Sequence, residues 1–229
     1  MGRPGWQPMT VVVLLGAPGA GKGTQAPILA RALGVPILAS GDLLRTAVAA
    51  GTALGREADR YMSRGQLVPD DTMVRVFLDR LEKPDARAGA ILDGFPRTRV
   101  QADALDRALE AAGRRVERAI FIDVEPEDLI RRMSNRRICT ANGHVYNLRS
   151  NPPVVDNLCD LDGSELVQRP DDDEATVRAR MKEQIPPLLE VVDHYRHAGV
   201  LQTVDGREPI SDVSERLLRA LETTPGRAD

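Results

Sequence analysis

Two kinds of apolar pattern alternate along this chain of 229 residues. Short runs of consecutive apolar residues, rich in β-branched side chains, predict buried strands at residues 11–15, 37–39, 90–93, 118–124 and 200–204. Between these runs, apolar residues recur every three or four positions and predict helices at residues 23–33, 41–50, 55–64, 70–82, 98–112, 125–135, 174–197 and 211–222. The alternation predicts an α/β fold with a five-stranded parallel sheet and helices on both faces.

Glycine and proline mark several of the predicted helix ends. Gly34 and Gly113 stand where C-caps are expected, and Pro126 stands at the start of a helix. The pair Pro186-Pro187 should break or kink the 174–197 helix in its middle, because proline lacks the backbone N–H that a helix interior needs.

Two stretches fall outside the alternation of strand and helix. Residues 39–68 are helical but contain no strand long enough for the central sheet. Residues 137–172 lose helical periodicity, are rich in Asn, Pro, Asp and Gly, and are too long for an ordinary connecting loop. The second stretch is therefore expected to form a small inserted lid.

Composition and charge narrow the class of protein. An apolar content of 42% and a charged content of 28% are typical of a soluble globular chain. The formal net charge of −3 gives no overall attraction to nucleic acid or to an anionic membrane, so no such partner is expected. A polyanionic ligand would have to meet a local cluster of positive side chains.

The ends of the chain and its cysteines carry further expectations. No apolar run reaches the length of a membrane span, and residues 1–9 lack the apolar stretch of a signal peptide, so a cytoplasmic location is expected. Residues 1–9 and 223–229 are expected to be disordered tails. Cys139 and Cys159 are too few to form a disulfide framework.

The strongest chemical signal lies at residues 16–24, which read GAPGAGKGT. A buried strand precedes them and a helix follows, so backbone N–H groups, the helix dipole and the charge of Lys22 converge on one point. This arrangement predicts a phosphate-binding loop. The alternative is a glycine-rich turn without a ligand, which is unattractive because ordering so many flexible residues in one turn costs conformational entropy. The hydroxyl that usually follows the lysine stands one residue later, at Thr24 after Gly23.

A second group of polar residues begins where the strand at 90–93 ends. Asp93 lies at the carboxyl edge of that strand, where ligands bind in open α/β sheets. A carboxylate beside a phosphate loop suits a Mg²⁺ ion held through water near Thr24 and Asp93. The guanidinium of Arg97 is suited to a phosphate, and Gln101, one turn into the next helix, to a base edge. The alternative is a turn with a capping Asp and an exposed Arg.

Arginines form a third pattern. Arg45 follows Ser40, which is expected to cap the helix that begins there. Arg132 and Arg136 are four residues apart and are predicted to share one helix face. Arg137 also precedes the predicted lid, and three more arginines follow it: Arg169, Arg178 and Arg180. Three aspartates are available to orient the arginines on both sides of the lid: Asp171, Asp172 and Asp173. Clustered like charges in an acidic chain indicate an anion between them, although a solvated charged face is the alternative.

At these residues the chain resembles the adenylate kinases with a long lid, which are nucleoside monophosphate kinases. The matching motifs follow the order and spacing of that family over nearly all of residues 10–222. They are GAPGAGKGT (16–24), SGDLLR (40–45), GQLVPD (65–70), LDGFPRT with the following Gln101, NRR (135–137), NPP (151–153), RPDD (169–172) and TVRAR (176–180). The offset of the hydroxyl to Thr24 also fits the loop of this family.

The resemblance implies a P-loop NTPase fold and reversible, Mg²⁺-dependent transfer of the terminal phosphoryl group of ATP to AMP, giving two ADP. It implies a core domain of residues 10–38, 69–134 and 173–222. It further implies an AMP-binding domain at 39–68, a lid at 135–172, and a monomer. Positioning and charge would perform most of the catalysis, so no general base is required.

The resemblance also assigns individual residues. ATP would be bound by Gly19, Ala20, Gly21, Lys22, Gly23, Thr24, Arg136, Val145, Tyr146 and Glu208. AMP would be bound by Ser40, Arg45, Gln66, Leu67, Val68, Gly94, Phe95, Pro96, Arg97, Gln101, Arg169 and Arg180. The catalytic residues would be Lys22, Arg97, Arg132, Arg136, Arg169 and Arg180. Ser40 stands where the family often has Thr and keeps the hydroxyl, and the side chain of Glu208 matters little if its loop contacts adenine through the backbone.

In the lid the sequence departs from the two Cys-x-x-Cys pairs that hold a structural zinc in many relatives. The pairs here are Cys139-x-x-Asn142 and Cys159-x-x-Asp162. Cys139, Cys159 and Asp162 are suitable zinc ligands, whereas Asn142 is a poor fourth. His144 would replace it only if the turn rearranges, and a water is another candidate. The alternative is a lid held by hydrogen-bonded polar groups without a metal.

Two other functions stay open at this point. A related kinase would use GTP as the donor or another nucleoside monophosphate as the acceptor, although Gln101 and the long lid favour AMP. A P-loop switch that signals rather than makes ADP is the alternative from a different class. Such a protein would not need arginines on both sides of a lid.

Overall fold

The computed structural model describes residues 10–64 and 66–222, so the predicted tails at 1–9 and 223–229 lie outside the described residues. A parallel sheet of five strands, in the order β2-β3-β1-β4-β8, forms the centre. The strands are β1 (Thr10–Leu15), β2 (Ile37–Ala39), β3 (Gly89–Asp93), β4 (Val116–Asp123) and β8 (Leu201–Asp205). The predicted five-stranded parallel sheet is confirmed.

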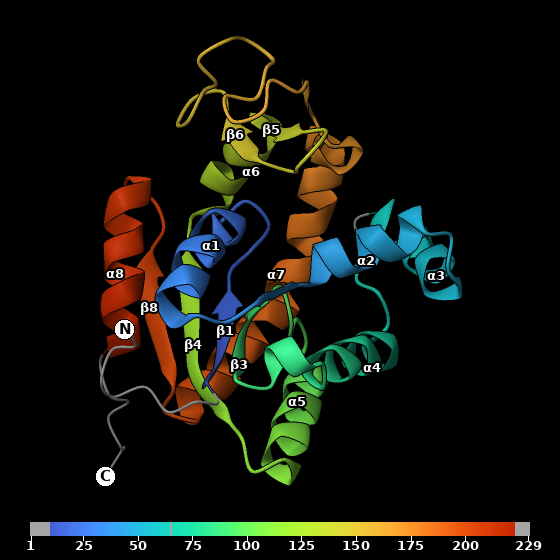
Figure 1. Ribbon diagram of the computed structural model, residues 1–229, viewed down its shortest axis with the longest axis vertical. Helices are drawn as coiled ribbons and strands as arrows, with labels where there is room; N and C mark the ends of the chain where they lie inside the picture. The colour runs from blue at the N-terminus through green and yellow to red at the C-terminus, as the bar shows by residue number, and fades with distance from the viewer. Residues whose placement is uncertain (1–9, 65, 223–229) are drawn as a thin grey trace.

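Helices cover both faces of this sheet, with α1 in front of the strands and α7 behind them in Figure 1. They are α1 (Lys22–Leu33), α2 (Ser40–Ala49), α3 (Ala53–Met62), α4 (Asp70–Leu81), α5 (Arg99–Ala111), α6 (Pro126–Ser134), α7 (Glu174–His197) and α8 (Ile210–Glu222), with short 3-10 turns η1 (Pro84–Ala86) and η2 (Pro170–Asp172). Every predicted helix is present. None of the helices within the described ranges has the length and apolar character to cross a lipid bilayer.

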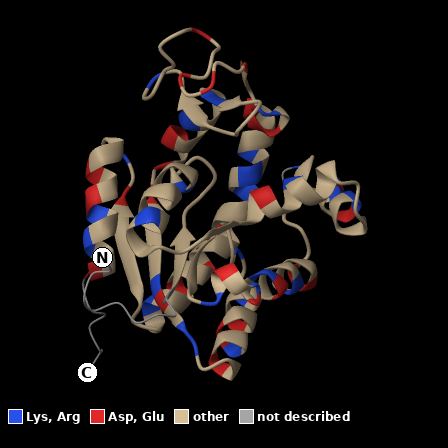
Figure 2. Ribbon diagram, viewed as in Figure 1, with Lys and Arg blue, Asp and Glu red and all other residues tan. Residues whose placement is uncertain are grey.

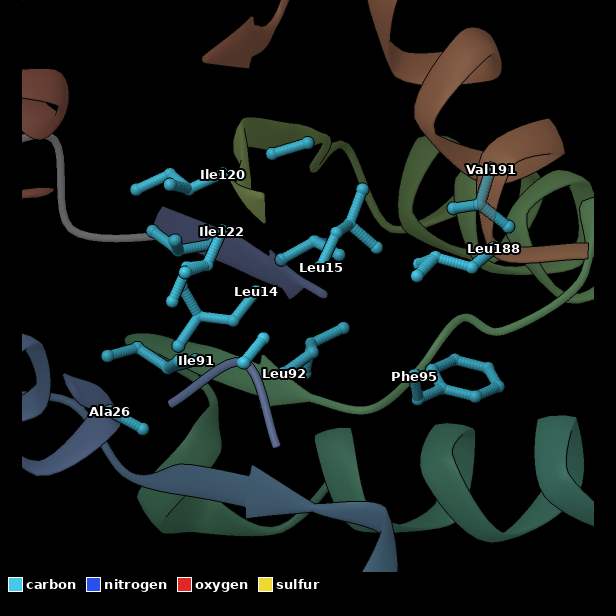
Figure 3. Close-up of a cluster of buried hydrophobic side chains, with 14 of the residues drawn as sticks. Leu14, Leu15, Ala26, Ile91, Leu92, Phe95, Ile120, Ile122, Leu188 and Val191 are labelled. Atoms are coloured by element: carbon cyan, nitrogen blue, oxygen red, sulfur yellow. The ribbon is translucent and has the colours of Figure 1, made fainter. Parts of the chain in front are cut away.

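The central strands are buried because both faces of the sheet are covered. Residues 11–14 of β1 have no exposed surface. Figure 3 shows side chains of β1, β3 and β4 packed between Ala26 of α1 and Leu188 and Val191 of α7. This packing explains why the apolar runs are continuous rather than alternating, and it holds the carboxyl ends of the strands as one rigid edge.

Residues 136–167 contain a second, antiparallel sheet, which we call the small sheet. Its strands are β5 (Arg136–Cys139), β6 (Val145–Asn147) and β7 (Leu166–Val167), in the order β6-β5-β7. A separate cluster of buried side chains supports it: Cys139, Tyr146, Cys159 and Leu166. The sequence analysis predicted no strand here, because strands this short carry almost no periodic signal.

The prediction that Pro186-Pro187 breaks the helix at 174–197 is wrong, since α7 runs without interruption through both prolines. The carbonyl groups that lose their N–H partners belong to Lys182 and Glu183, which lie on the exposed side where water can reach them. The following turns are anchored by buried Leu188 and Val191. Burial of this face therefore keeps the helix continuous.

Candidate functional site

A cleft of about 890 Å³ lies at the carboxyl ends of the central strands. Its walls come from the 16–24 loop, the start of α2, the end of β3, the small sheet and the 206–211 loop. All strands of a parallel sheet end at the same edge, so polar segments distant in the sequence meet here.

The 16–21 loop joins β1 to α1 and has the form of an anion cradle. Gly19 and Gly21 have φ angles of 87° and 104°, in the left-handed region that favours glycine. A Cβ on Gly19 would lie 2.9 Å from Cγ of Met133 and 3.0 Å from the carbonyl oxygen of Leu129. Helix α6 thus approaches the loop too closely for a side chain, and the loop N–H groups stay gathered at the start of α1.

Lys22 is the first residue of α1, and its side chain folds back over the loop. Its Nζ donates to the carbonyl oxygens of Gly16 at 2.6 Å and Ala17 at 3.1 Å. Burial lowers the pKa of Lys22 to about 8, Asp93 opposes this shift, and three arginines across the cleft reinforce it. An anion in the loop would give the ammonium of Lys22 a negatively charged partner in addition to these carbonyl oxygens.

Asp93 ends β3, as predicted, close enough to Lys22 for their charges to interact. Burial raises the pKa of Asp93, although the charges of Lys22 and Arg97 work against this. Asp93 and Thr24 line the same cleft. A carboxylate and a hydroxyl at one edge fit a Mg²⁺ ion that keeps most of its water shell.

The arginines that line this cleft include four from separate parts of the chain: Arg97, Arg136, Arg169 and Arg180. Burial, and secondly the charge of Arg180, lowers the pKa of Arg97 to about 10. Burial, and secondly the charge of Arg45, lowers the pKa of Arg169 to about 10. Figure 2 shows blue turns on α7 between the small sheet and α2. Mutually repelling cations are the arrangement that a polyanion would stabilise.

Carboxylates hold two of these arginines, as the sequence analysis anticipated. Asp172, which is fully buried, accepts from Arg136 Nε at 2.7 Å and Nη2 at 2.5 Å. Asp171 accepts from Nη1 of Arg180 at 2.8 Å. Asp173 has a different role, because it caps α7 by accepting from a backbone N–H of that helix.

The prediction that Arg132 and Arg136 share a helix face is wrong. Helix α6 ends at Ser134, and Arg136 begins β5, where the backbone pairs with β6 and the guanidinium pairs with Asp172. Arg132 stays on α6, and its Nη2 donates to the carbonyl oxygen of Gly206 at 2.7 Å. It therefore lies at the 206–211 loop rather than beside its expected neighbour.

The other residues expected to bind ATP lie around the same cleft. Val145 is half-exposed on β6, and Tyr146 is buried in the small sheet, yet both contribute to the lining. Glu208 lines the cleft from the 206–211 loop, and its Oε1 accepts from Nη2 of Arg216 at 2.6 Å. The cleft thus gathers the whole group predicted for ATP.

A second cavity of about 70 Å³ shares part of its wall with the cleft. Eight of the residues predicted for AMP line this cavity, together with Leu44, Met62, Met73 and others: Ser40, Arg45, Gln66, Leu67, Val68, Arg97, Gln101 and Arg180. Arg97 and Arg180 belong to both walls. The small cavity therefore opens onto the same cations as the large one.

The remaining predicted residues at the end of β3 differ in what they offer. Gly94 and Pro96 line the large cleft. Phe95 lines neither cavity, because it is fully buried and stacks on Phe77 with ring centroids 4.1 Å apart. Gln101 is 1% exposed, and its Nε2 donates to Oδ1 of Asp70 at 2.8 Å. A base that contacts Gln101 must share its amide with Asp70.

Ser40 does not cap α2, contrary to the prediction. Ala39 is the N-cap, and Ser40 Oγ accepts from Nη2 of Arg97 at 3.0 Å instead. The sequence analysis also missed Gln184, whose Oε1 accepts from Nη1 of Arg97 at 3.0 Å. Its position four residues after Arg180, on the same helix face, is the signal that was available.

The small sheet brings together Cys139, His144, Cys159 and Asp162, with one potential ligand atom of each within 4.8 Å of the others. His144 Nδ1 lies 3.2 Å from Sγ of Cys159 and 3.3 Å from a carboxylate oxygen of Asp162. His144, rather than Asn142, is therefore the fourth potential metal ligand. The turn at Gly143, with a φ of 70°, brings His144 back toward Cys139. Asn142 supports the site by donating to Asp162 at 2.8 Å.

Comparison with known proteins gives a consistent result. The sequence model of the family described as adenylate kinase matches residues 14–200. The chain is 42% identical to an adenylate kinase of Caldicellulosiruptor bescii over 210 residues, which cover 92% of this chain and 98% of that protein. It is 42% identical to one of Staphylococcus aureus and 44% identical to one of Archaeoglobus fulgidus, each over 211 residues and 92% of this chain. The alignments cover 98% and 97% of those proteins.

Proposed function

Because the chain belongs to the adenylate kinase family and transfers the terminal phosphoryl group of ATP to AMP, we propose how its own residues divide this work. ATP occupies the large cleft, with its phosphates on the loop at Gly19–Thr24. AMP occupies the small cavity, with its phosphate against Arg97. The observation that carries this proposal is the shared wall, since Arg97 and Arg180 line both cavities.

The chemistry asked of the protein is electrostatic. In phosphoryl transfer, negative charge spreads over the equatorial oxygens of the moving group, and cations arranged beforehand stabilise it. We assign this role to Lys22, Arg97, Arg136, Arg169, Arg180 and Arg132. Arg132 would first have to leave the carbonyl oxygen of Gly206. Mg²⁺, which the family generally uses, would be held through water near Thr24 and Asp93 and would neutralise phosphate charge.

We propose that two inserted segments close over the nucleotides. Residues 39–68 form an AMP-binding domain and residues 135–172 form a lid, while residues 10–38, 69–134 and 173–222 form the core. Both inserts contribute residues to the cleft, which supports this division. Closure excludes water, which would otherwise accept the phosphoryl group and hydrolyse ATP.

We further propose that the lid holds a structural zinc ion on Cys139, His144, Cys159 and Asp162. Two thiolates, an imidazole and a carboxylate are all suitable zinc ligands, and their mutual distances suit one tetrahedral ion. The ion would tie the turns at 139–144 and 159–162 together. Its chemistry there is structural, away from the reacting phosphates.

The assignment of Arg97 is tested by steady-state kinetics of Arg97→Ala. The substitution should raise KM for AMP and lower kcat by about a hundredfold, with a smaller effect on KM for ATP, because a charged hydrogen-bond partner of the acceptor phosphate is lost. Unchanged values of both parameters would contradict the assignment.

A coupled assay for the nucleoside diphosphate products, run over four donors and four acceptors, tests whether ATP and AMP are preferred.

Location and oligomeric state belong to the same proposal. We propose a monomer that works in the cytoplasm with ATP, AMP and ADP as its ligands. Light scattering at micromolar concentration tests the first point, because a dimer would scatter with twice the expected mass.

A further inference from the structure

Gln184 contacts the candidate acceptor site, although no motif of the sequence pointed to it. It lies on α7, is 7% exposed, and lines both cavities. Its Oε1 accepts from Nη1 of Arg97 at 3.0 Å, across 87 residues of sequence. A buried amide that accepts a hydrogen bond from Arg97 is a candidate for a role in binding the acceptor nucleotide.

Arg97 is held by three uncharged oxygens. Its Nε donates to the carbonyl oxygen of Gly94 at 2.7 Å, its Nη2 to Ser40 Oγ at 3.0 Å, and its Nη1 to Gln184. The close approach depends on Gly94, where a Cβ would lie 2.6 Å from Ser40 Oγ and 2.9 Å from Nη2 of Arg97. The guanidinium is therefore fixed from three sides.

The remaining donors of Arg97 point to its use. A guanidinium has five N–H groups, and the contacts with Gly94, Ser40 and Gln184 use three of them. Within the described residues, these contacts leave one N–H on each terminal nitrogen, and two such N–H groups can donate together to a phosphate. Rotation of the guanidinium would remove this pair from the site.

The uncharged state of these partners matters as much as their position. Arg136 and Arg180 pair with the carboxylates of Asp172 and Asp171, which compensate part of their charge. The hydrogen-bond partners of Arg97 are an amide, a hydroxyl and a carbonyl, which orient it without neutralising it. Among the described residues, only the charge of Asp93, which is not hydrogen-bonded to Arg97, therefore opposes its attraction for an anion. A carboxylate at position 184 would accept the same hydrogen bond but compete with the phosphate.

We propose that Gln184 is a positioning residue for the acceptor nucleotide, which orients the guanidinium of Arg97 toward the phosphate without reducing its charge. The inference rests on the proposed role of Arg97 in binding AMP. It predicts that shape and charge at position 184 have separable effects on the reaction.

The test compares Gln184→Glu with Gln184→Met in steady-state kinetics with each nucleotide varied. Gln184→Glu should raise KM for AMP about tenfold and leave KM for ATP within about twofold, because the new carboxylate opposes the acceptor phosphate. Gln184→Met has a similar size but no acceptor, and should lower kcat about tenfold because Arg97 is no longer oriented. The control is Leu189→Glu, which adds the same charge on an exposed position of α7 and should change neither KM.

Several outcomes would overturn the inference. One is that both Gln184 variants keep the KM for AMP and kcat within twofold of the original values. Another is that both KM values rise together with a lower Tm, which indicates a purely structural residue. Arg97→Ala, measured alongside, distinguishes a failure of the proposed role of Arg97 from a failure of the proposed role of Gln184. If it leaves AMP kinetics unchanged, the proposed role of Arg97 fails. If it impairs them while the Gln184 variants do not, only the role of Gln184 fails.

Discussion

Lys22 shows a conflict between function and stability within one residue. The folded chain surrounds this ammonium with loop carbonyls and nearby arginines, and burial lowers its pKa to about 8. Without an anion, the charged form is therefore less favourable in the folded protein than in the unfolded chain. Under the proposed binding of ATP to this loop, a phosphate would compensate this unfavourable charge.

This argument predicts opposite effects of Lys22→Met on activity and stability. Activity should fall by at least about a hundredfold, because a charge beside the moving phosphoryl group is lost. The Tm of the nucleotide-free protein should rise by about 2–4 °C, because an uncompensated buried charge is removed. Activity assays and calorimetry measure the two effects.

The gain in Tm should depend on pH in a defined direction. The unfolded chain keeps the lysine proton up to about 10.5, whereas the folded protein releases it above about 8. The original protein therefore gains stability relative to the methionine variant as pH rises between these values. Lys83→Met, at an exposed lysine, serves as the control and should show no such trend. A lower Tm for Lys22→Met at pH 7 would contradict the argument.

At the scale of elements, the small sheet is a compact unit with its own chemistry. Its three strands are two to four residues long and share a small buried cluster. Sheets this small usually need a metal or another cross-link to hold a single conformation. The four converging ligand groups supply a physical means of doing so.

The zinc proposal predicts about one equivalent of zinc in protein purified without added metal, and a lower Tm after chelation. His144→Ala should lose the metal, because it removes a ligand. Asn142→Ala should keep it, because the side chain of Asn142 contacts only Asp162, and the backbone N–H that donates to Sγ of Cys139 is retained in the variant. Metal analysis measures all three proteins. Zinc below about a tenth of an equivalent would show that polar contacts alone hold the lid.

At the scale of the whole molecule, the fold places two cavities against one wall of cations. Arg97 follows β3 and Arg180 lies on α7, yet both line the cleft and the smaller cavity. Each insert reaches the cleft from a different side, with α2 and the small sheet set apart in Figure 1. A ligand that spans both cavities should therefore engage both inserts together.

A compound of two adenosines joined through five phosphates tests this expectation. At 100 times its Kd it should stabilise the protein by about 2.7 kcal/mol and raise Tm by several degrees. Amide hydrogen exchange should slow in both inserts, within residues 39–64 and 135–172, because each closes on one end of the ligand. ATP alone should slow exchange mainly in the lid. Protection of a single insert by the two-headed compound would contradict the shared wall.

Much of the fold was predictable because its signals are local. Continuous apolar runs such as residues 11–15 identify buried strands, and the glycines and lysine at 16–24 identify the phosphate loop. The end of a strand also placed Asp93 at the ligand-binding edge. These features depend on neighbours within a few residues, so they are visible without the folded structure.

Pairing between distant side chains was not predictable in the same way. Arg136 leaves the helix pattern because Asp172, 36 residues away, holds it in β5. Ser40 faces Arg97 rather than its own helix end. Each of these local expectations was overridden by a partner that the sequence alone does not identify.

The sequence by itself determined which functional motifs are present and their order along the chain: a phosphate loop first, then Asp93 and Arg97, then arginines on both sides of an insert. Only the tertiary structure decided which groups touch, because parallel strands carry distant segments to one edge. It set Gln184 and Ser40 against Arg97, Arg132 against Gly206, and His144 against Cys159. Residue type decides what chemistry is available, but the close contacts that orient charge depend on how the whole chain packs.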